Sequence, residues 1–157
     1  MKFSAQEEYG LRCLLRIGKY FPVNKALTIP EISQYEGITV HNVAKLLRIL
    51  RINGFVESER GQTGGYTLSR PPEKIIVGEV LAALGGRLFR EEEFCNTHSR
   101  PESSFCTQTI DCSLRSLWRM LQGSVDQVLN NLTLRDLLTG EQAIPENRFL
   151  GAEPRVF

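Results

Sequence analysis

Residues 28–68 constrain the fold of this chain most, because two short helical patterns are followed directly by a glycine-rich turn. The run from Thr28 to Glu31 is a capping box with proline in the first turn, and it predicts a short helix to about Tyr35. Thr39 can cap a second helix that ends near Asn53 and carries apolar residues at helical spacing. Two helices joined by a tight turn are a helix-turn-helix candidate.

A hairpin pattern follows this helix pair at once. Two short runs of strand-forming residues, 55–58 and 66–68, flank residues 60–65, which include three glycines. Glycine supplies the positive φ angles that a tight hairpin needs. A helix-turn-helix followed by such a hairpin is the pattern of a winged helix. We therefore expect a mainly α-helical fold built on a winged helix-turn-helix domain.

Further helical patterns lie on both sides of this segment. A capping box at Ser4 begins a helix that is expected to end near Phe21, and another helix is expected over residues 76–84. A helix of about five turns begins at Ser113, and a short helix follows Thr133. The long helix carries an apolar stripe formed by Leu114, Leu117, Trp118, Leu121, Val125, Val128, Leu129 and Leu132. This stripe is longer than a small domain covers by itself, which predicts a homodimer with the long helix at its seam.

These patterns divide the chain into four expected parts. Residues 1–86 should form the winged-helix DNA-binding domain and residues 87–112 a cysteine-containing loop. Residues 113–139 should form the dimerisation helix with the short helix after it, and residues 140–157 a flexible tail. The tail carries glycine, proline and charge without periodicity, which is typical of a mobile segment.

The second helix of a helix-turn-helix pair enters the major groove, so its first turns should carry residues that bind DNA. Side chains there that can donate or accept hydrogen bonds are Thr39, His41, Asn42 and Lys45. At the expected hairpin tip, Arg60 suits a narrow minor groove and Gln62 can contact the DNA backbone. The alternative is that Thr39 only caps its helix and that His41 is merely solvated.

The charge distribution is consistent with a DNA-binding first half. Residues 1–70 contain 10 basic and 6 acidic side chains, whereas residues 71–157 contain 9 basic and 12 acidic ones. The net positive charge therefore lies in the half that is expected to face phosphate.

Three of the four cysteines, Cys95, Cys106 and Cys112, fall within 18 residues of polar sequence. Such a segment offers a thiol little apolar surface, although cysteine is usually a buried residue. Clustered thiols of this kind bind a metal ion, bind an iron–sulfur cluster or form disulfides. The fourth, Cys13, lies in a helical pattern and is expected in the core.

The sequence argues against several other classes of protein. No run approaches 18 apolar residues and the first residues have no apolar core, so we expect neither a membrane span nor a signal peptide. We therefore expect a cytoplasmic protein, whose clustered cysteines act as ligands or redox centres in reducing surroundings. Two histidines, with no nucleophile elbow and no phosphate-binding loop, leave little from which to build an enzyme.

Several runs, in the same order along the chain, resemble the IscR/NsrR-type family of bacterial winged-helix transcription regulators. They are residues 38–61, 64–71, 77–84, 112–118 and 129–137. The resemblance implies a dimeric DNA-binding regulator whose loop cysteines hold an iron–sulfur cluster. That cluster would sense redox state, nitric oxide or iron–sulfur supply.

The resemblance also implies a ligand set for the cluster. In some members an acidic residue near the start of the first helix, supplied by the partner subunit, is the fourth ligand, and Glu8 stands at that position. The implied ligands are then Cys95, Cys106, Cys112 and Glu8, around a centre with two irons and two sulfurs rather than four. The state of the cluster would bias how the two recognition helices are spaced on DNA.

Alternatives to this ligand set remain open. His98 with the three clustered cysteines has the ligand types of a structural zinc site. The thiols could also form a redox switch without any cluster. For Glu8, the alternative is a surface ion pair with Arg12, four residues further along the same helix.

Overall fold

The structure is a computed structural model that describes residues 4–59, 61, 64–85 and 113–140. Arg60 and Gln62 lie outside the described residues, as do His98 and the three clustered cysteines. The flexible tail expected over residues 140–157 also falls outside them, except for its first residue.

The order of the elements is that of a winged helix followed by further helices. Helix α1 (Ala5–Tyr20) continues into a short 3-10 helix, η1 (Phe21–Val23), and is followed by α2 (Ile29–Glu36) and α3 (Val40–Ile52). Strands β1 (Val56–Glu59) and β2 (Gly65–Leu68) form an antiparallel hairpin in which Val56 pairs with Leu68. The remaining elements are η2 (Pro72–Lys74), α4 (Val77–Leu84), α6 (Ser113–Asn130) and α7 (Leu134–Leu138).

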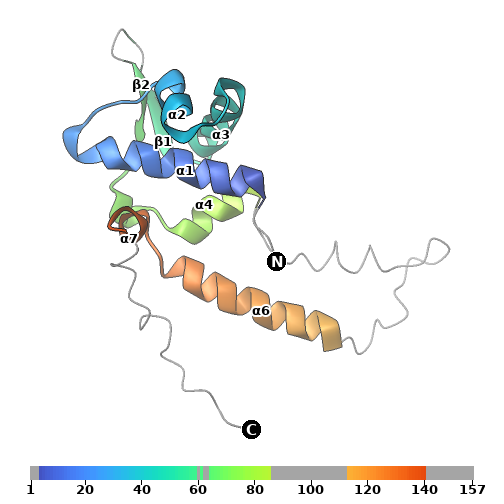
Figure 1. Cartoon of the computed structure of the whole chain (residues 1–157). Coiled ribbons are helices and arrows are strands. Elements are labelled where there is room, and N and C mark those ends of the chain that lie inside the picture. The colour runs from blue at the N-terminus through green and yellow to red at the C-terminus, as the bar shows by residue number, and fades with distance from the viewer. Residues whose placement is uncertain (1–3, 60, 62–63, 86–112, 141–157) are drawn as a thin grey trace, which may run out of the picture.

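Helix α1 crosses the middle of the molecule (Figure 1). On one side it contacts α2, α3 and β2, and on the other it contacts α4 and α7. Helix α6 lies beyond α4, which it contacts, and the hairpin projects away from both. The winged helix-turn-helix fold predicted from the sequence is confirmed by this arrangement.

Side-chain caps fix where the helices begin. Ser4, Thr28 and Thr133 each accept a hydrogen bond from the backbone three residues on, and an acidic side chain bonds back to complete a capping box. At α3 the Oγ1 atom of Thr39 accepts from the backbone N–H of Asn42 at 3.4 Å. All four predicted caps are confirmed. Each cap involves residues that lie within four positions of one another, so the sequence alone reveals it.

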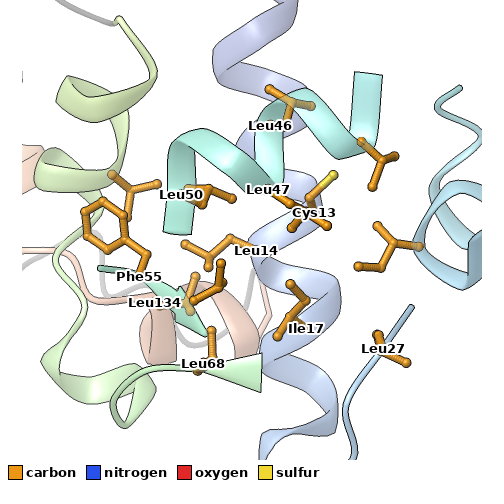
Figure 2. Close-up of a cluster of buried hydrophobic side chains, with 14 of the residues drawn as sticks. Cys13, Leu14, Ile17, Leu27, Leu46, Leu47, Leu50, Phe55, Leu68 and Leu134 are labelled. Carbon is orange, nitrogen blue, oxygen red and sulfur yellow. The ribbon is translucent and has the colours of Figure 1, made fainter. Parts of the chain in front are cut away.

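One hydrophobic core joins the helices to the base of the hairpin (Figure 2). Helix α1 contributes Cys13, Leu14 and Ile17, and α3 packs against them with its buried face. The other buried members labelled in the figure are Leu27, Leu46, Leu47, Leu50, Phe55, Leu68 and Leu134. Each fully buried leucine contributes roughly 1.5–3 kcal/mol relative to an exposed one. The core therefore fixes α3 and the hairpin on α1.

A single residue before α2 pairs with the hairpin as a third, very short strand segment, which the sequence did not predict. Leu27 forms a β-bridge with Tyr66, with N···O distances of 3.1 and 2.8 Å in the two directions. A Cβ atom at Gly65 would lie 2.7 Å from the carbonyl carbon and oxygen of Leu27. The chain before α2 thus passes so close to β2 that only glycine fits there.

The apolar stripe of α6 is divided between two environments. Its C-terminal end packs on α4, where Val77 and Leu81 form a second hydrophobic cluster with Leu132. Near its start, large apolar side chains are exposed: Leu114 by 57%, Leu117 by 45%, Met120 by 68% and Leu121 by 37%. None of the helices in the described ranges combines the length and the hydrophobicity that a membrane span requires.

Candidate DNA-binding face and sensor residues

Helix α3 has one buried face and one exposed face. Its buried face consists of Val43, Leu46, Leu47 and Leu50. The predicted DNA-binding residues of this helix, Thr39, His41, Asn42 and Lys45, are all exposed. Arg48 and Arg51, one and two turns further on, are exposed as well. Polar and basic groups therefore gather on the face that is turned away from the core, where DNA can reach them.

The capping role of Thr39 and a role in DNA binding are compatible. The Oγ1 atom acts as an acceptor toward the backbone of Asn42, and the hydroxyl hydrogen can still be donated outward. The hairpin that should carry Arg60 and Gln62 follows α3 along the chain, and its strand β1 contacts α3. Neither residue is among those that the structure describes.

Glu8 lies on α1 with 61% of its side chain exposed. Its Oε1 atom is 3.8 Å from Nη1 of Arg12, so the surface ion pair considered as an alternative is present. At this distance the pair is longer than a hydrogen bond, and exposed pairs of this kind contribute about 0–1 kcal/mol. The carboxylate is therefore only weakly held by its neighbour.

Arg12 also reaches Glu36, the last residue of α2. Its Nε atom lies 3.1 Å from Oε2 of Glu36, and its Nη2 atom donates to the Glu36 carbonyl oxygen at 2.7 Å. Arg16 donates from Nε to Oε1 of the same carboxylate at 2.6 Å. The Glu36 side chain is only 10% exposed. Two arginines of α1 thus hold the turn that leads into α3.

An apolar groove with a volume of about 370 Å³ runs beside Glu8 and Arg12. Its apolar lining comes from α1, α4, α6 and the segment through α7: Leu11, Leu15, Val77, Leu81, Leu129, Leu132 and Leu137. The exposed start of α6 and this groove are both apolar surfaces. Monomeric proteins rarely expose large contiguous apolar patches, and such patches mark sites of association.

Cys13 lies in the core, as predicted, with no exposed surface. Burial and the nearby negative charge of Glu36 raise the pKa of its thiol from 9.0 to about 12. A thiol that stays protonated is a poor nucleophile and a poor metal ligand. Cys13 is therefore a structural residue of the core and not a candidate for thiol chemistry.

The described residues bring only part of the predicted site together. They place Thr39, His41, Asn42 and Lys45 on one face, and they place Glu8 beside the groove. No group of three or more histidine, cysteine or acidic side chains that could hold a metal ion occurs within the described ranges. No sequence pattern indicated the contacts between Glu36 and α1, since 20 and 24 residues separate the partners.

Comparisons with known proteins agree with this geometry. Residues 3–140 match the Rrf2 family, which is described as iron-dependent transcriptional regulators. Protein rrf2 of Nitratidesulfovibrio vulgaris is 33% identical over 147 residues, which span 94% of this chain and 93% of that protein.

Two solved structures share the fold. CymR (YrzC), the global cysteine regulator of B. subtilis, has a TM-score of 0.70 and 26% identity over 88% of this chain and 97% of that one. IscR of T. potens has a TM-score of 0.69 and 27% identity over 88% of this chain and 87% of that one. Because the family match spans the winged helix, α6 and α7 together, the chain belongs to the Rrf2 family of DNA-binding transcriptional regulators and is not an enzyme.

Proposed function

We propose that this protein is a homodimeric regulator whose affinity for its operator is set by the state of a bound iron–sulfur cluster. The observation that carries the sensing half of the proposal is the position of Glu8, which is exposed, weakly paired and set beside an apolar groove. We also propose that the protein acts in the cytoplasm, where a regulator of transcription meets its operator.

For DNA binding, the proposed contacts follow from the exposed face of α3. Thr39, His41 and Asn42 would meet base edges at the start of the helix. Lys45 would reach a base or a phosphate, Arg60 the minor groove and Gln62 the DNA backbone. The exposed Arg48 and Arg51 would add sequence-independent attraction to phosphate, which falls as the salt concentration rises.

For the dimer, we propose that the exposed start of α6 packs against a second copy of the chain. Leu114, Leu117 and Leu121 lie on one face of this helix and remain partly exposed in the single chain. A helix with an apolar stripe of this length is stable in water when a partner covers it. The apolar groove between α1 and α6 offers further surface of the same character.

For the cluster, the proposed ligands are Cys95, Cys106 and Cys112 of one subunit and Glu8 of the partner subunit. The donor set fits iron: thiolates are the usual ligands of iron–sulfur clusters, and a carboxylate gives one weaker, exchangeable position. Glu8 suits this role because its carboxylate is exposed and its pairing with Arg12 is long. When bound, the cluster would supply a redox-active group, with a two-iron, two-sulfur centre proposed over a four-iron one.

Coupling to DNA binding would pass through Arg12. This guanidinium lies between the carboxylates of Glu8 and Glu36, at 3.8 Å and 3.1 Å. If Glu8 serves as a ligand of the partner's site, Arg12 loses one of its two acidic neighbours and its interaction with Glu36 changes. Because Glu36 precedes the turn into α3, we propose that this shifts the population of recognition-helix positions.

The first test is anaerobic purification, followed by a visible spectrum and analysis of iron, sulfide and zinc. Iron and sulfide in stoichiometric amounts would support the cluster. Bound zinc without sulfide would favour the zinc alternative with His98. A protein without metal after reconstitution would favour a thiol switch. Either of the last two results would overturn the cluster proposal and leave DNA binding intact.

The second test separates the ligands and the coupling. Glu8→Ala and Cys95→Ala should each lower cluster content or shorten its lifetime in air, whereas Glu73→Ala, which removes an exposed carboxylate on η2, should not. Operator affinity is then measured for the loaded and the cluster-free protein on a site selected from random DNA. Equal affinities would contradict the proposed sensing.

A further inference from the structure

We infer that Arg70 is a positioning residue for DNA binding: it fixes the end of the recognition helix and the base of the wing against α4. Arg70 lies two residues after the end of β2. It is therefore not part of α3, whose exposed face is expected to contact DNA. The inference rests on the family's DNA-binding activity and does not depend on the cluster or the dimer.

The guanidinium of Arg70 makes contacts in several directions at once. Its Nη1 atom donates to the carbonyl oxygen of Gly54 at 2.8 Å, and its Nε atom donates to the carbonyl oxygen of Lys74 at 3.0 Å. Its Nη2 atom lies 3.4 Å from Oε2 of Glu79, and its central carbon lies 5.1 Å from the centre of the Phe55 ring. A planar guanidinium with fixed donors suits such a site, because its N–H groups diverge in fixed directions.

Gly54 and Phe55 are the residues that end the recognition helix. Gly54 has a φ of +73° and donates to the carbonyl of Arg51, while Phe55 donates to the carbonyl of Leu50 at 2.9 Å. This pair of bonds is a Schellman motif, which closes a helix and turns the chain away from it. Arg70 therefore contacts both residues of the motif: it donates to the carbonyl oxygen of Gly54 and lies over the ring of Phe55.

The same place is the base of the wing. Phe55 directly precedes β1, and Ser69 directly follows β2. The backbone N–H of Ser69 donates to the carbonyl of Phe55 at 3.1 Å, and its hydroxyl donates to the same Gly54 oxygen that accepts from Arg70. One guanidinium thus secures the point at which α3, β1 and β2 meet.

Two other nitrogen atoms of Arg70 contact η2 and α4, and α4 in turn contacts α6. Lys74 belongs to η2 and Glu79 lies in the first turn of α4. Helix α4 packs on α6 through Val77 and Leu81. A change in the position of α4 would therefore be passed through Arg70 to the wing and the recognition helix. Without the Arg70 side chain, α4 would move independently of the wing and the recognition helix.

Two other roles would predict different behaviour. If Arg70 contacted a phosphate, its loss would weaken binding to all DNA sequences equally and reduce the salt dependence by about one phosphate contact. If Arg70 only stabilised the fold, binding measured far below the unfolding transition would not change. A positioning role predicts that contacts to the bases are misaligned while the phosphate attraction is kept.

The test compares Arg70→Gln and Arg70→Lys with the wild-type chain and with Arg135→Gln. Arg135 is a suitable control because it carries the same charge, is about half exposed and pairs with Glu73 at 3.5 Å, away from the wing. Affinity is measured for a selected operator and for random duplex DNA at several salt concentrations. A urea titration of each variant confirms that more than nine-tenths of it is folded under the binding conditions.

Arg70→Gln should lower operator affinity by about tenfold or more, as expected for losing roughly one good base contact, while binding to random DNA and the salt slope stay unchanged. Arg70→Lys should not restore the affinity, because an ammonium group cannot replace three divergent donors. Glu79→Gln should cause a smaller loss of operator affinity, again without a change in binding to random DNA. This variant replaces the Arg70 variants in the test if they do not fold. A parallel loss on both DNAs with a reduced slope would overturn the inference, and so would unchanged operator affinity.

Discussion

The Nε atom of Arg16 lies 2.6 Å from Oε1 of Glu36, and this contact joins the first helix to the end of the helix that precedes the recognition helix. Arg12 binds the other oxygen of the same carboxylate. A single acidic side chain therefore receives two cations from successive turns of α1. Since Glu36 is almost buried, its charge is compensated within the protein rather than by water.

Glu36→Gln should destabilise the protein, because two guanidinium groups lose their shared counter-charge. We expect a loss of about 1–2 kcal/mol, below the value for a fully buried pair because Arg12 and Arg16 are partly exposed. Urea unfolding provides the measurement. Glu73→Gln, at an ion pair whose two side chains are about half exposed, should change stability by less than about 0.5 kcal/mol. Equal effects of the two substitutions would show that the Glu36 contacts add nothing specific.

Gly65→Ala and Gly123→Ala should change stability in opposite directions. At Gly65 a Cβ atom would lie 2.7 Å from the backbone of Leu27, so the chain beside β2 must move, at a cost of about 1–3 kcal/mol. At Gly123, within α6, nothing lies within 4 Å of the added atom. Alanine there should stabilise the helix by about 0.5–1 kcal/mol. Thermal unfolding distinguishes the two signs, and a neutral Gly65→Ala would contradict the close approach of Leu27.

Leu117→Glu should dissociate the proposed dimer. The side chain is 45% exposed in the single chain, so a monomer tolerates the charge, whereas burial of a carboxylate in an apolar seam costs several kcal/mol. Light scattering after size-exclusion chromatography reports the mass. Ser116→Glu is the matched control, because Ser116 is exposed on the opposite side of α6. A wild-type chain that is already monomeric at micromolar concentration would refute the dimer.

Cys13 should make stability depend on pH above about pH 9. Its pKa is raised from 9.0 to about 12 in the folded protein, so the folded state keeps a proton that the unfolded state loses. The contribution is fully present below pH 9 and falls as pH rises toward 12, by up to about 1.4 kcal/mol per unit. Cys13→Ala should lose stability at every pH but show a shallower decline between pH 9 and pH 10.5. Parallel declines in urea unfolding would argue against the shift.

Much of the architecture was predictable because its determinants are local. The boxes at Ser4, Thr28 and Thr133 and the cap at Thr39 each lie within four residues, and the helices begin there in the structure. The apolar spacing of Val43, Leu46, Leu47 and Leu50 marked the buried face of α3, so its exposed face followed as well. The burial of Cys13 followed from the same periodicity.

The predicted limits of the strands and of several helices differ from the observed ones by one residue. The first strand was expected over residues 55–58, but β1 spans Val56–Glu59 because Phe55 completes the motif that ends α3. The bridge between Leu27 and Tyr66 was not anticipated, since a single residue pair leaves no periodic pattern. The DNA contacts of Thr39, His41, Asn42, Lys45, Arg60 and Gln62 stay predictions. So do the roles of Glu8 and of the clustered cysteines.

By itself, then, the sequence determined the winged helix, the helix starts and the candidate DNA-binding face, because periodicity and capping act between residues that are close along the chain. The tertiary structure alone decided which distant groups meet: Glu36 with Arg12 and Arg16, and Arg70 with Gly54 and Glu79. It also decided that one end of the α6 stripe is covered by α4 while the other is exposed. Such pairings depend on how the core places whole helices, and no local pattern of residues encodes that placement.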